Sequence, residues 1–165
     1  MKEGLVLVTL LALDQSSKIT GYAIFKNQEL VQHGVINLSS IDDVGKRLLL
    51  LREYIEDLII DYSVDKIAFE DIQLQSTVGN NVKTFKVLAE VFGVIHELCY
   101  HRAIPCQIVP SVTWKSYLNI KGKTRPEQKA AAKEYVCGKY TDLVGHVTQD
   151  ECDAICIGTY AAKGL

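Results

Sequence analysis

Four acidic residues occupy positions from which their carboxylates could act together. Asp14 follows the run Leu5–Leu13, which is apolar except for one threonine, and Glu70 ends the shorter run DKIAFE. Both runs have the length and composition of buried strands, where a carboxylate is costly unless it is paired, hydrogen-bonded or metal-bound. Asp150 and Asp153 are three residues apart in the first turn of a predicted helix. That spacing puts them on one helix face, and the helix dipole favours anions there.

Packing this helix against the two strand ends would bring the four carboxylates together. Such a cluster repels itself unless divalent cations occupy it, and oxygen ligands without Cys or His select magnesium or manganese. Two ions about 4 Å apart would suit in-line hydrolysis of a phosphodiester, one activating water and the other stabilising the leaving oxygen. Asp71 alternates to the opposite face of its strand, so we expect no ligand role for it.

Each acid also has a simpler interpretation. Asp14 could cap the turn Gln15–Ser17, Glu70 could lie on the surface at a strand end, and Asp is common in a first helical turn. The joint interpretation is favoured by the order of the elements. A strand ending in Asp opens a three-stranded meander, which is followed by a helix, a strand ending in Glu and, at the end, a helix with a DxxD pattern.

The periodicity of apolar residues predicts the elements that hold these acids. Three antiparallel strands are expected first and two short strands later, at Leu5–Leu13, Tyr22–Phe25, Gln28–Leu38, Asp65–Glu70 and Pro105–Val109. Helices are expected at Asp43–Tyr62, at Val82–Arg102, within Pro110–Leu118, from Thr124 to about Val136, and at Gln149–Lys163. Thr124 and Thr148 are of N-cap type, Gly138 is expected to end the fourth helix, and the polar stretch Asp71–Asn81 is expected to be a mobile loop.

Composition indicates a globular protein. A hydrophobic share of 48% and a charged share of 23% are ordinary, and we expect residues 1–165 to form a single domain. The apolar N-terminal run ends in an acid without a clear cleavage site, and no other segment approaches the roughly 18 apolar residues of a membrane helix. We therefore expect a cytoplasmic protein without a membrane partner. The five cysteines include no CxxC pair, which argues against a disulfide framework and a structural zinc site.

Charge is unevenly distributed along the chain. The net charge is −2, but the segment Lys115–Lys139 has seven basic residues against two acidic ones, so it carries +5 and the remainder −7. A basic tract on an otherwise acidic protein suits a polyanion that must approach a cluster of carboxylates. A solvated helix face is the alternative. The residues of this tract that we assign to the phosphates of such a polyanion are Lys115, Lys121, Lys123, Arg125, Lys129 and Lys133.

Three segments carry a family resemblance. In this order, ALDQSSKITGYAIF, KIAFED and QDECDAICIG resemble the RuvC family of Holliday junction resolvases, within the RNase H-like nuclease superfamily. The resemblance spans nearly the whole chain. It implies an α/β fold with a five-stranded mixed sheet flanked by helices, the first three strands forming an antiparallel meander. It also implies a homodimer and a magnesium-dependent nuclease that makes paired nicks in four-way DNA junctions.

The resemblance also implies roles for individual residues. By position, it assigns the catalytic metal ligands to Asp14, Glu70, Asp150 and Asp153, which would hold two Mg2+ ions per site, with Mn2+ as a substitute. Lys115 and Lys129 fall near the family's functional lysines. The aromatic residue that family members commonly have three positions beyond the second acid is replaced by Gln73, which bears on sequence preference and junction selectivity. The divergence, short length and odd cysteines resemble a phage or mobile-element member, whose location would be the host cytoplasm.

Two features of the helices have competing interpretations. On the long second helix, Leu88, Phe92 and Ile95 are candidates for a dimer interface or for ordinary core. Trp114 could stack on a base, or it could anchor its short helix to the core.

We expect a metal-dependent, structure-specific DNA endonuclease that resolves Holliday junctions and other branched DNA by paired nicks. One alternative is a protein that binds branched DNA without cutting it, and another is an RNase H-like nuclease acting on an RNA/DNA hybrid. A nucleotide-binding module of the actin and sugar-kinase type also opens with a strand Asp. It would need a second phosphate loop and usually a second domain, for which 165 residues leave no room.

Overall fold

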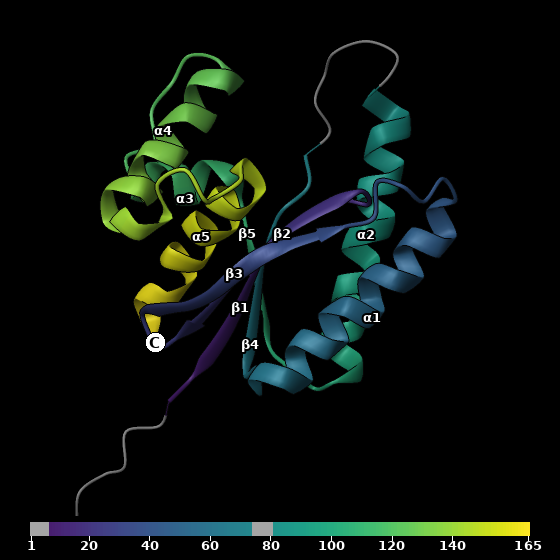
Figure 1. Cartoon of the computed structure of the whole chain (residues 1–165). Coiled ribbons are helices and arrows are strands. Elements are labelled where there is room, and N and C mark those ends of the chain that lie inside the picture. Colours follow the sequence, from purple (N-terminus) through teal and green to yellow (C-terminus); the bar gives the residue numbers. More distant parts are fainter. Residues whose placement is uncertain (1–6, 74–80) are drawn as a thin grey trace, which may run out of the picture.

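The computed structural model describes residues 7–73 and 81–165, in which one five-stranded sheet has helices on both faces (Figure 1). The strands are β1 (Thr9–Asp14), β2 (Ile19–Lys26), β3 (Glu29–Asn37), β4 (Lys66–Glu70) and β5 (Cys106–Val109). The helices are α1 (Val44–Tyr62), α2 (Asn81–His101), α3 (Ser111–Tyr117), α4 (Arg125–Lys139) and α5 (Gln149–Ala161). Short 3-10 turns follow α4 at Thr141–Leu143 and α5 at Ala162–Gly164.

The sheet has the order β3-β2-β1-β4-β5, so the first strand of the chain is its central strand. β1, β2 and β3 form an antiparallel meander. β4 pairs with β1 and β5 pairs with β4 in parallel, after crossovers through α1 and α2. The expected mixed sheet of five strands is therefore confirmed.

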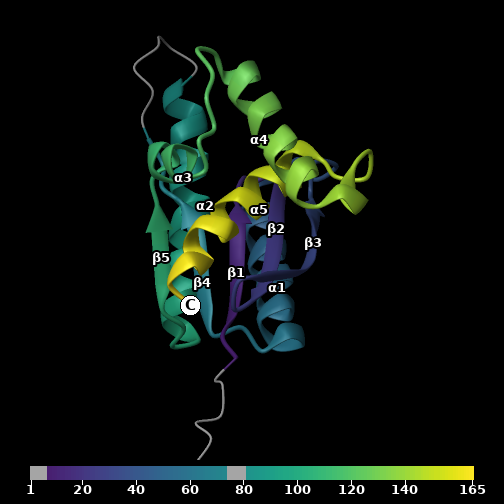
Figure 2. The same cartoon turned by 90° about the vertical axis from the view of Figure 1, so that its left-hand side faces the viewer.

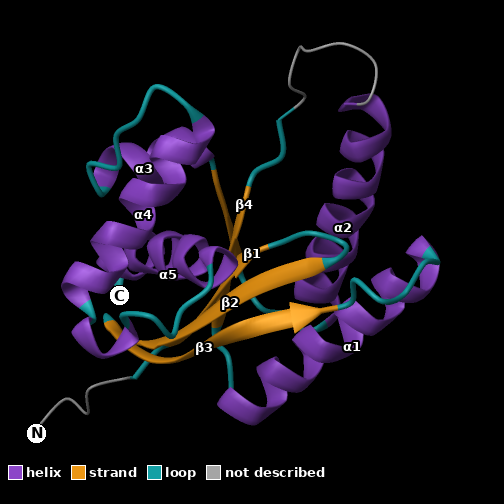
Figure 3. Ribbon diagram, turned by 45° about the horizontal axis from the view of Figure 1, so that its top comes forward, coloured by secondary structure: helices purple, strands orange, loops and turns teal. Residues whose placement is uncertain are grey.

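The alternation of side chains along β1 divides the core into two layers. Leu10 and Ala12 pack with α5, whereas Leu11 and Leu13 pack with α1 and α2, and all four are fully buried. This burial on both faces explains why the first strand is a continuous apolar run. Figure 2 shows α5 lying across one face of the sheet, and Figure 3 shows α1 and α2 on the opposite side.

The predicted helix starts are confirmed by their caps. Thr124 and Thr148 both form capping boxes, with Glu127 and Glu151 respectively. The expectation that Gly138 ends α4 was wrong, because the helix continues to Lys139. A glycine in the last turn of a helix costs only about 1 kcal/mol relative to alanine, so glycine alone does not stop a helix.

Other boundaries differ from the sequence-based prediction by a few residues. β1 begins at Thr9, and the first two residues of the strand predicted from Leu5 lie outside the described residues. β2 begins at Ile19, earlier than predicted, because Ile19 still pairs with Asn37 of β3. Most of the loop predicted at Asp71–Asn81 also lies outside the described residues. Of the helices in the described ranges, none is both long and apolar enough to cross a membrane.

Candidate active site

Asp14 and Glu70 are the last residues of two adjacent parallel strands. In the pairing of β1 with β4, Ala12 lies opposite Ala68, and both alanines belong to the core layer that contains α5. Because side chains alternate along a strand, residues two positions further on point to the same face. The two carboxylates therefore lie side by side on the α5 face of the sheet.

A glycine allows α5 to approach this edge closely. Gly21 of β2 is the pairing partner of Asp14. A Cβ atom at position 21 would lie 2.0 Å from the main-chain oxygen of Asp150, so any other residue would push the start of α5 away. The absence of a side chain brings Asp150 and, one turn later, Asp153 toward the strand end that carries Asp14.

The start of α5 is also fixed by Glu151. Its carboxylate accepts hydrogen bonds from the main-chain N–H and the hydroxyl of Thr148, both at 2.8 Å, and lies 2.7 Å from Nδ1 of His33 on β3. Burial raises the pKa of Glu151, but these hydrogen bonds outweigh it and the pKa is lowered. Glu151 therefore ties α5 to β3 rather than joining the other acids.

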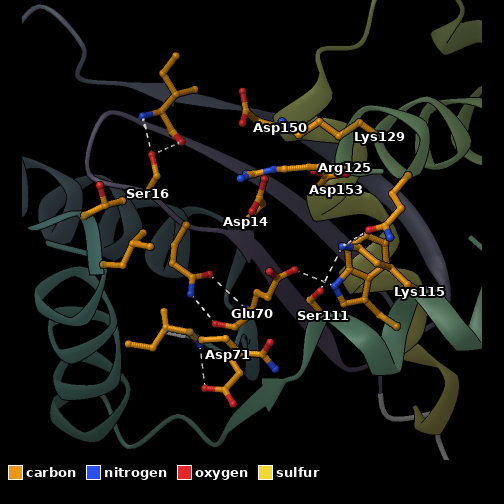
Figure 4. A pocket seen from close by; sticks show the side chains of 18 of the residues that line it. Asp14, Ser16, Glu70, Asp71, Ser111, Lys115, Arg125, Lys129, Asp150 and Asp153 are labelled. Carbon is orange, nitrogen blue, oxygen red and sulfur yellow. Dashed lines mark hydrogen bonds between the residues drawn. The ribbon is translucent and has the colours of Figure 1, made fainter. Parts of the chain in front are cut away.

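The four predicted acids line one cleft of about 650 Å³ (Figure 4). Residues of α2, α3, α4 and α5 complete its walls. Of the six predicted DNA-binding residues, the cleft includes Lys115, Arg125 and Lys129. The other three, Lys121, Lys123 and Lys133, are exposed outside it.

Two further residues at the end of β4 line the same cleft. Gln73 is exposed and occupies the position where the resemblance leads us to expect an aromatic side chain. The Asp71 carboxylate accepts a hydrogen bond from the neighbouring main-chain N–H of Ile72 at 2.9 Å. Asp71 thus satisfies a local donor, and we assign it no ligand role.

Burial and mutual repulsion raise the pKa values of three of the acids. For Asp14, burial and then the carboxylates of Asp153 and Glu70 raise the pKa well above its usual range. Burial also raises the pKa of Glu70 against a hydrogen bond from Trp114, and that of Asp153 against one from Gln149. Ionisation of these carboxylates is therefore unfavourable in the folded state, and a bound cation would offset that cost.

Two residues that bind Glu70 had no signal in the sequence. The Gln15 side chain accepts from the main-chain N–H of Glu70 at 3.1 Å and donates to its carbonyl at 2.5 Å. The Trp114 indole donates to Oε2 of Glu70 at 2.8 Å. The partners are 55 and 44 residues apart, and local patterns do not predict hydrogen bonds at that separation.

The structure decides between the competing interpretations for two of the four apolar candidates, Trp114 and Ile95. Trp114 is 2% exposed and belongs to the core, so base stacking is excluded. Ile95 is fully buried, and Phe92 packs edge-on against Phe69 with ring centroids 5.1 Å apart. Ile95 is therefore core, whereas Phe92 is half-buried and packs at the edge of the core, so its exposed part is still a candidate for an interface. Leu88 is half-buried and lines the cleft.

The donor types of the cleft fit a divalent cation. Its acidic residues offer only oxygen, and none of the described residues that line it is a His or Cys. The half-buried carboxylate of Asp14 accepts no hydrogen bond from residues 7–73 or 81–165, so its oxygens are available. Within those same ranges, however, no three Asp, Glu, His or Cys side chains are close enough together to hold one ion. The carboxylates line the cleft without already forming a closed cage.

A comparison with protein families decides the relationship. The model of the family described as crossover junction endodeoxyribonuclease RuvC matches residues 10–157. The chain belongs to the RuvC family. RuvC-family nucleases are metal-dependent, and membership decides against the sugar-kinase alternative.

A relative with a RuvC name agrees with this family membership. A protein named crossover junction endodeoxyribonuclease RuvC from Clostridioides difficile (strain 630) is 26% identical over 100 residues. The match covers 58% of this chain and 57% of that protein, so it spans little more than half the length of each.

Solved structures of proteins named as RuvC or as resolvases have the same fold. T. thermophilus RuvC in complex with Holliday junction substrate has a TM-score of 0.70 at 12% identity, covering 95% of this chain and 94% of that chain. The fowlpox virus resolvase, solved with Holliday junction DNA, has a TM-score of 0.67 at 12% identity, covering 95% and 98%. The yeast mitochondrial Holliday junction resolvase Ydc2 has a TM-score of 0.64 at 16% identity, covering 93% and 77%. The RNase H-like fold expected from the sequence is therefore confirmed.

Proposed function

We propose that this chain is a metal-dependent endonuclease that cuts four-way DNA junctions and other branched DNA by hydrolysing phosphodiester bonds. The observation that carries the proposal is the cleft in which four carboxylates face three basic side chains. Carboxylates suit divalent cations, and basic side chains suit phosphates. Membership of the RuvC family supports the assignment of both to one reaction.

We assign the metal ligands to Asp14, Glu70, Asp150 and Asp153. Their oxygen donors favour Mg2+ or Mn2+, and four carboxylates suit two ions. When bound, the ions would supply Lewis-acid activation of water and stabilisation of the leaving oxygen. The chain contributes rigidity, because two of the acids end adjacent strands and the other two are on a helix that packs against them.

We propose that the basic side chains in and beside the cleft bind the phosphates of the DNA backbone. Lys115 is held in place by Ser111 and Gln128, at 3.1 and 3.2 Å, so its charge has a defined position. Lys129 is half-buried and Arg125 is exposed, both on the wall formed by α4. The related proteins from T. thermophilus and fowlpox virus were solved with Holliday junction DNA, which supports a junction as the substrate.

Paired nicks follow most simply from a homodimer. A two-fold dimer would present two equivalent clefts to a two-fold junction, and we propose this arrangement for the chain. We treat residues 1–165 as one nuclease domain, with the cytoplasm as its expected location.

The test is cleavage of a labelled four-way junction in Mg2+, alongside a fork, a linear duplex and an RNA/DNA hybrid. We expect the wild type to nick the junction or the fork. Asp153→Asn should cut at a rate lower by roughly 10³-fold, because a metal ion contributes several kcal/mol to such a reaction. Binding of the junction, measured separately by fluorescence anisotropy, should be largely retained.

The matched control is Asp57→Asn, the same chemical change at an exposed position of α1. It should cut as the wild type does. Equal cutting by Asp153→Asn would remove this residue from the site. If the wild type bound the junction without cutting it, the chain would be a protein that recognises branched DNA. If it cut only the RNA/DNA hybrid, it would be a nuclease that acts on the hybrid.

A further inference from the structure

The main chain of Glu70 pairs with Val109 of β5 and is tied to β1 by Gln15. The amide of Gln15 makes two hydrogen bonds to the peptide groups of Glu70, at 3.1 and 2.5 Å, and Gln15 is itself buried. This pair joins the ends of β1 and β4, so the Cα of Glu70 has a fixed position relative to Asp14. The side chain beyond Cα has three rotatable bonds that Gln15 does not restrain.

The carboxylate of Glu70 is restrained by Trp114. The indole Nε1 donates to Oε2 at 2.8 Å, and an indole N–H can only donate. Trp114 is 2% exposed and is packed in the core layer on the α5 face of the sheet. Its neighbours therefore fix the position of the indole N–H. Within the described part of the chain, the second oxygen of Glu70 accepts no hydrogen bond, which leaves it available to a ligand.

The indole is also connected to the basic wall of the cleft. The Lys115 ammonium lies 5.2 Å from the centre of the Trp114 ring, within the range of a cation–π interaction. Its hydrogen bonds with Ser111 and Gln128 connect α3 to α4. One buried side chain thus touches a proposed metal ligand at its edge and a proposed phosphate-binding lysine at its ring.

We infer that Trp114 is a positioning residue, whose indole N–H orients the Glu70 carboxylate for a divalent cation. The inference rests on the proposed function only in taking Glu70 as a ligand. Phenylalanine would fill much of the same core volume but would donate no hydrogen bond. Loss of such an outer partner of a metal ligand typically costs 10–100-fold in metal affinity or activity.

The first experiment measures Mn2+ binding by isothermal titration calorimetry in the absence of DNA. Trp114→Phe should bind Mn2+ at least about 10-fold more weakly than the wild type. Its cleavage of the junction should be reduced at low Mn2+ and recover at saturating Mn2+. A merely structural role would lower the rate at every metal concentration. The control is Tyr117→Phe, an aromatic change on the same helix at an exposed position, which should leave Mn2+ affinity unchanged.

The second experiment uses Trp114 as its own probe, because it is the only tryptophan in the chain. Its emission should change saturably when Mg2+ is added to the wild type, and Glu70→Gln should abolish the change. This measurement decides the inference if Trp114→Phe does not fold.

Two results would overturn the inference. One is unchanged Mn2+ affinity in a folded Trp114→Phe, and the other is wild-type emission that does not respond to saturating Mg2+ while calorimetry records binding. Neither result would contradict the proposed function. That proposal would instead be contradicted if the wild type neither bound metal nor cut DNA.

Discussion

Ionisation of the Asp14 carboxylate is costly in this fold. This carboxylate lies at the end of the central strand, half-buried, and it accepts no hydrogen bond from the described residues. Burial, followed by the charges of Asp153 and Glu70, raises its pKa. Without a cation, the charged form therefore reduces the stability of the folded state.

We predict that Asp14→Asn is more stable than the wild type in metal-free buffer at pH 7. The pKa of Asp14 is raised on folding, so the stability it contributes is present below its ordinary pKa of 3.8 and is lost as the pH rises through the folded value. Asparagine does not ionise and avoids that loss. Thermal unfolding in EDTA from pH 3 to pH 8 should give midpoints that converge at low pH and separate toward neutrality.

Exposed Asp57→Asn serves as the control and should show no such separation. Added Mg2+ should raise the wild-type midpoint more than that of Asp14→Asn, because a ligand stabilises the state that binds it. Equal midpoints of wild type and Asp14→Asn across the whole pH range would contradict the stated cost of the Asp14 charge.

The position of α5 depends on its close approach to the sheet. A Cβ at Gly21 would meet the Asp150 carbonyl, and one at Gly158 would lie 2.2 Å from the ring of Phe25. These glycines let the helix lie directly on β1 and β2. The acids of α5 reach the strand ends only because of this close packing.

We predict that Gly21→Ala destabilises the protein by about 1–3 kcal/mol, the usual cost of overpacking, and also removes cleavage. The atom in the way belongs to the main chain, so no side-chain rotation can relieve the clash. A thermal midpoint measured with and without Mn2+ would check both effects, since a displaced α5 should also lose the stabilisation by metal.

The comparison variant is Gly93→Ala, in the middle of α2, where an added Cβ would meet nothing within 4 Å. It should stabilise the chain by roughly 0.5–1 kcal/mol, because alanine favours the helix over glycine. If Gly21→Ala behaved like Gly93→Ala, the close packing of α5 would not be needed.

The acids at the strand ends were predictable from the sequence, because each stands at the end of an apolar run that a sheet would bury, where a carboxylate is costly. A long apolar run that ends in Asp14, and a short one that ends in Glu70, each place an acid where a buried strand stops. Strand alternation did not separate Asp71 from the acids in the same way, because β4 ends at Glu70 and Asp71 lines the same cleft. The alternation also predicts which side chains share a core layer, and the structure confirms this for β1.

The partners of these acids could not be predicted in the same way. Gln15 and Trp114 act on Glu70 through hydrogen bonds between distant parts of the chain. The basic tract was visible as composition, but composition does not state which lysines face the cleft, and Lys121 does not. Gly138 was misleading because its preference for helix ends is weaker than the packing of α4.

The molecule as a whole is acidic with one basic segment, and this should control how DNA binding depends on salt. The exposed Lys121 and Lys123 precede α4. Replacing both with alanine should weaken junction binding and reduce the slope of log affinity against log salt concentration by about 0.9 for each phosphate that the variant no longer neutralises. Anisotropy titrations at several salt concentrations would measure this slope.

Lys46→Ala provides the control, because Lys46 is exposed on α1, on the other face of the sheet. Its slope should match that of the wild type. An unchanged slope in the Lys121 and Lys123 variant would place the DNA path elsewhere on the surface.

The order of the elements along the chain has a consequence for biosynthesis. The central strand β1 is translated first, but α5, which covers one of its faces, is translated last among the helices described. At roughly 5–20 residues per second, the ribosome reaches Asp153 on the order of 10 s after Asp14. During that interval Leu10 and Phe25 lack their cover, and the four acids cannot yet meet. Until α5 has emerged, a growing chain therefore cannot assemble the proposed site, and it exposes apolar surface that favours aggregation.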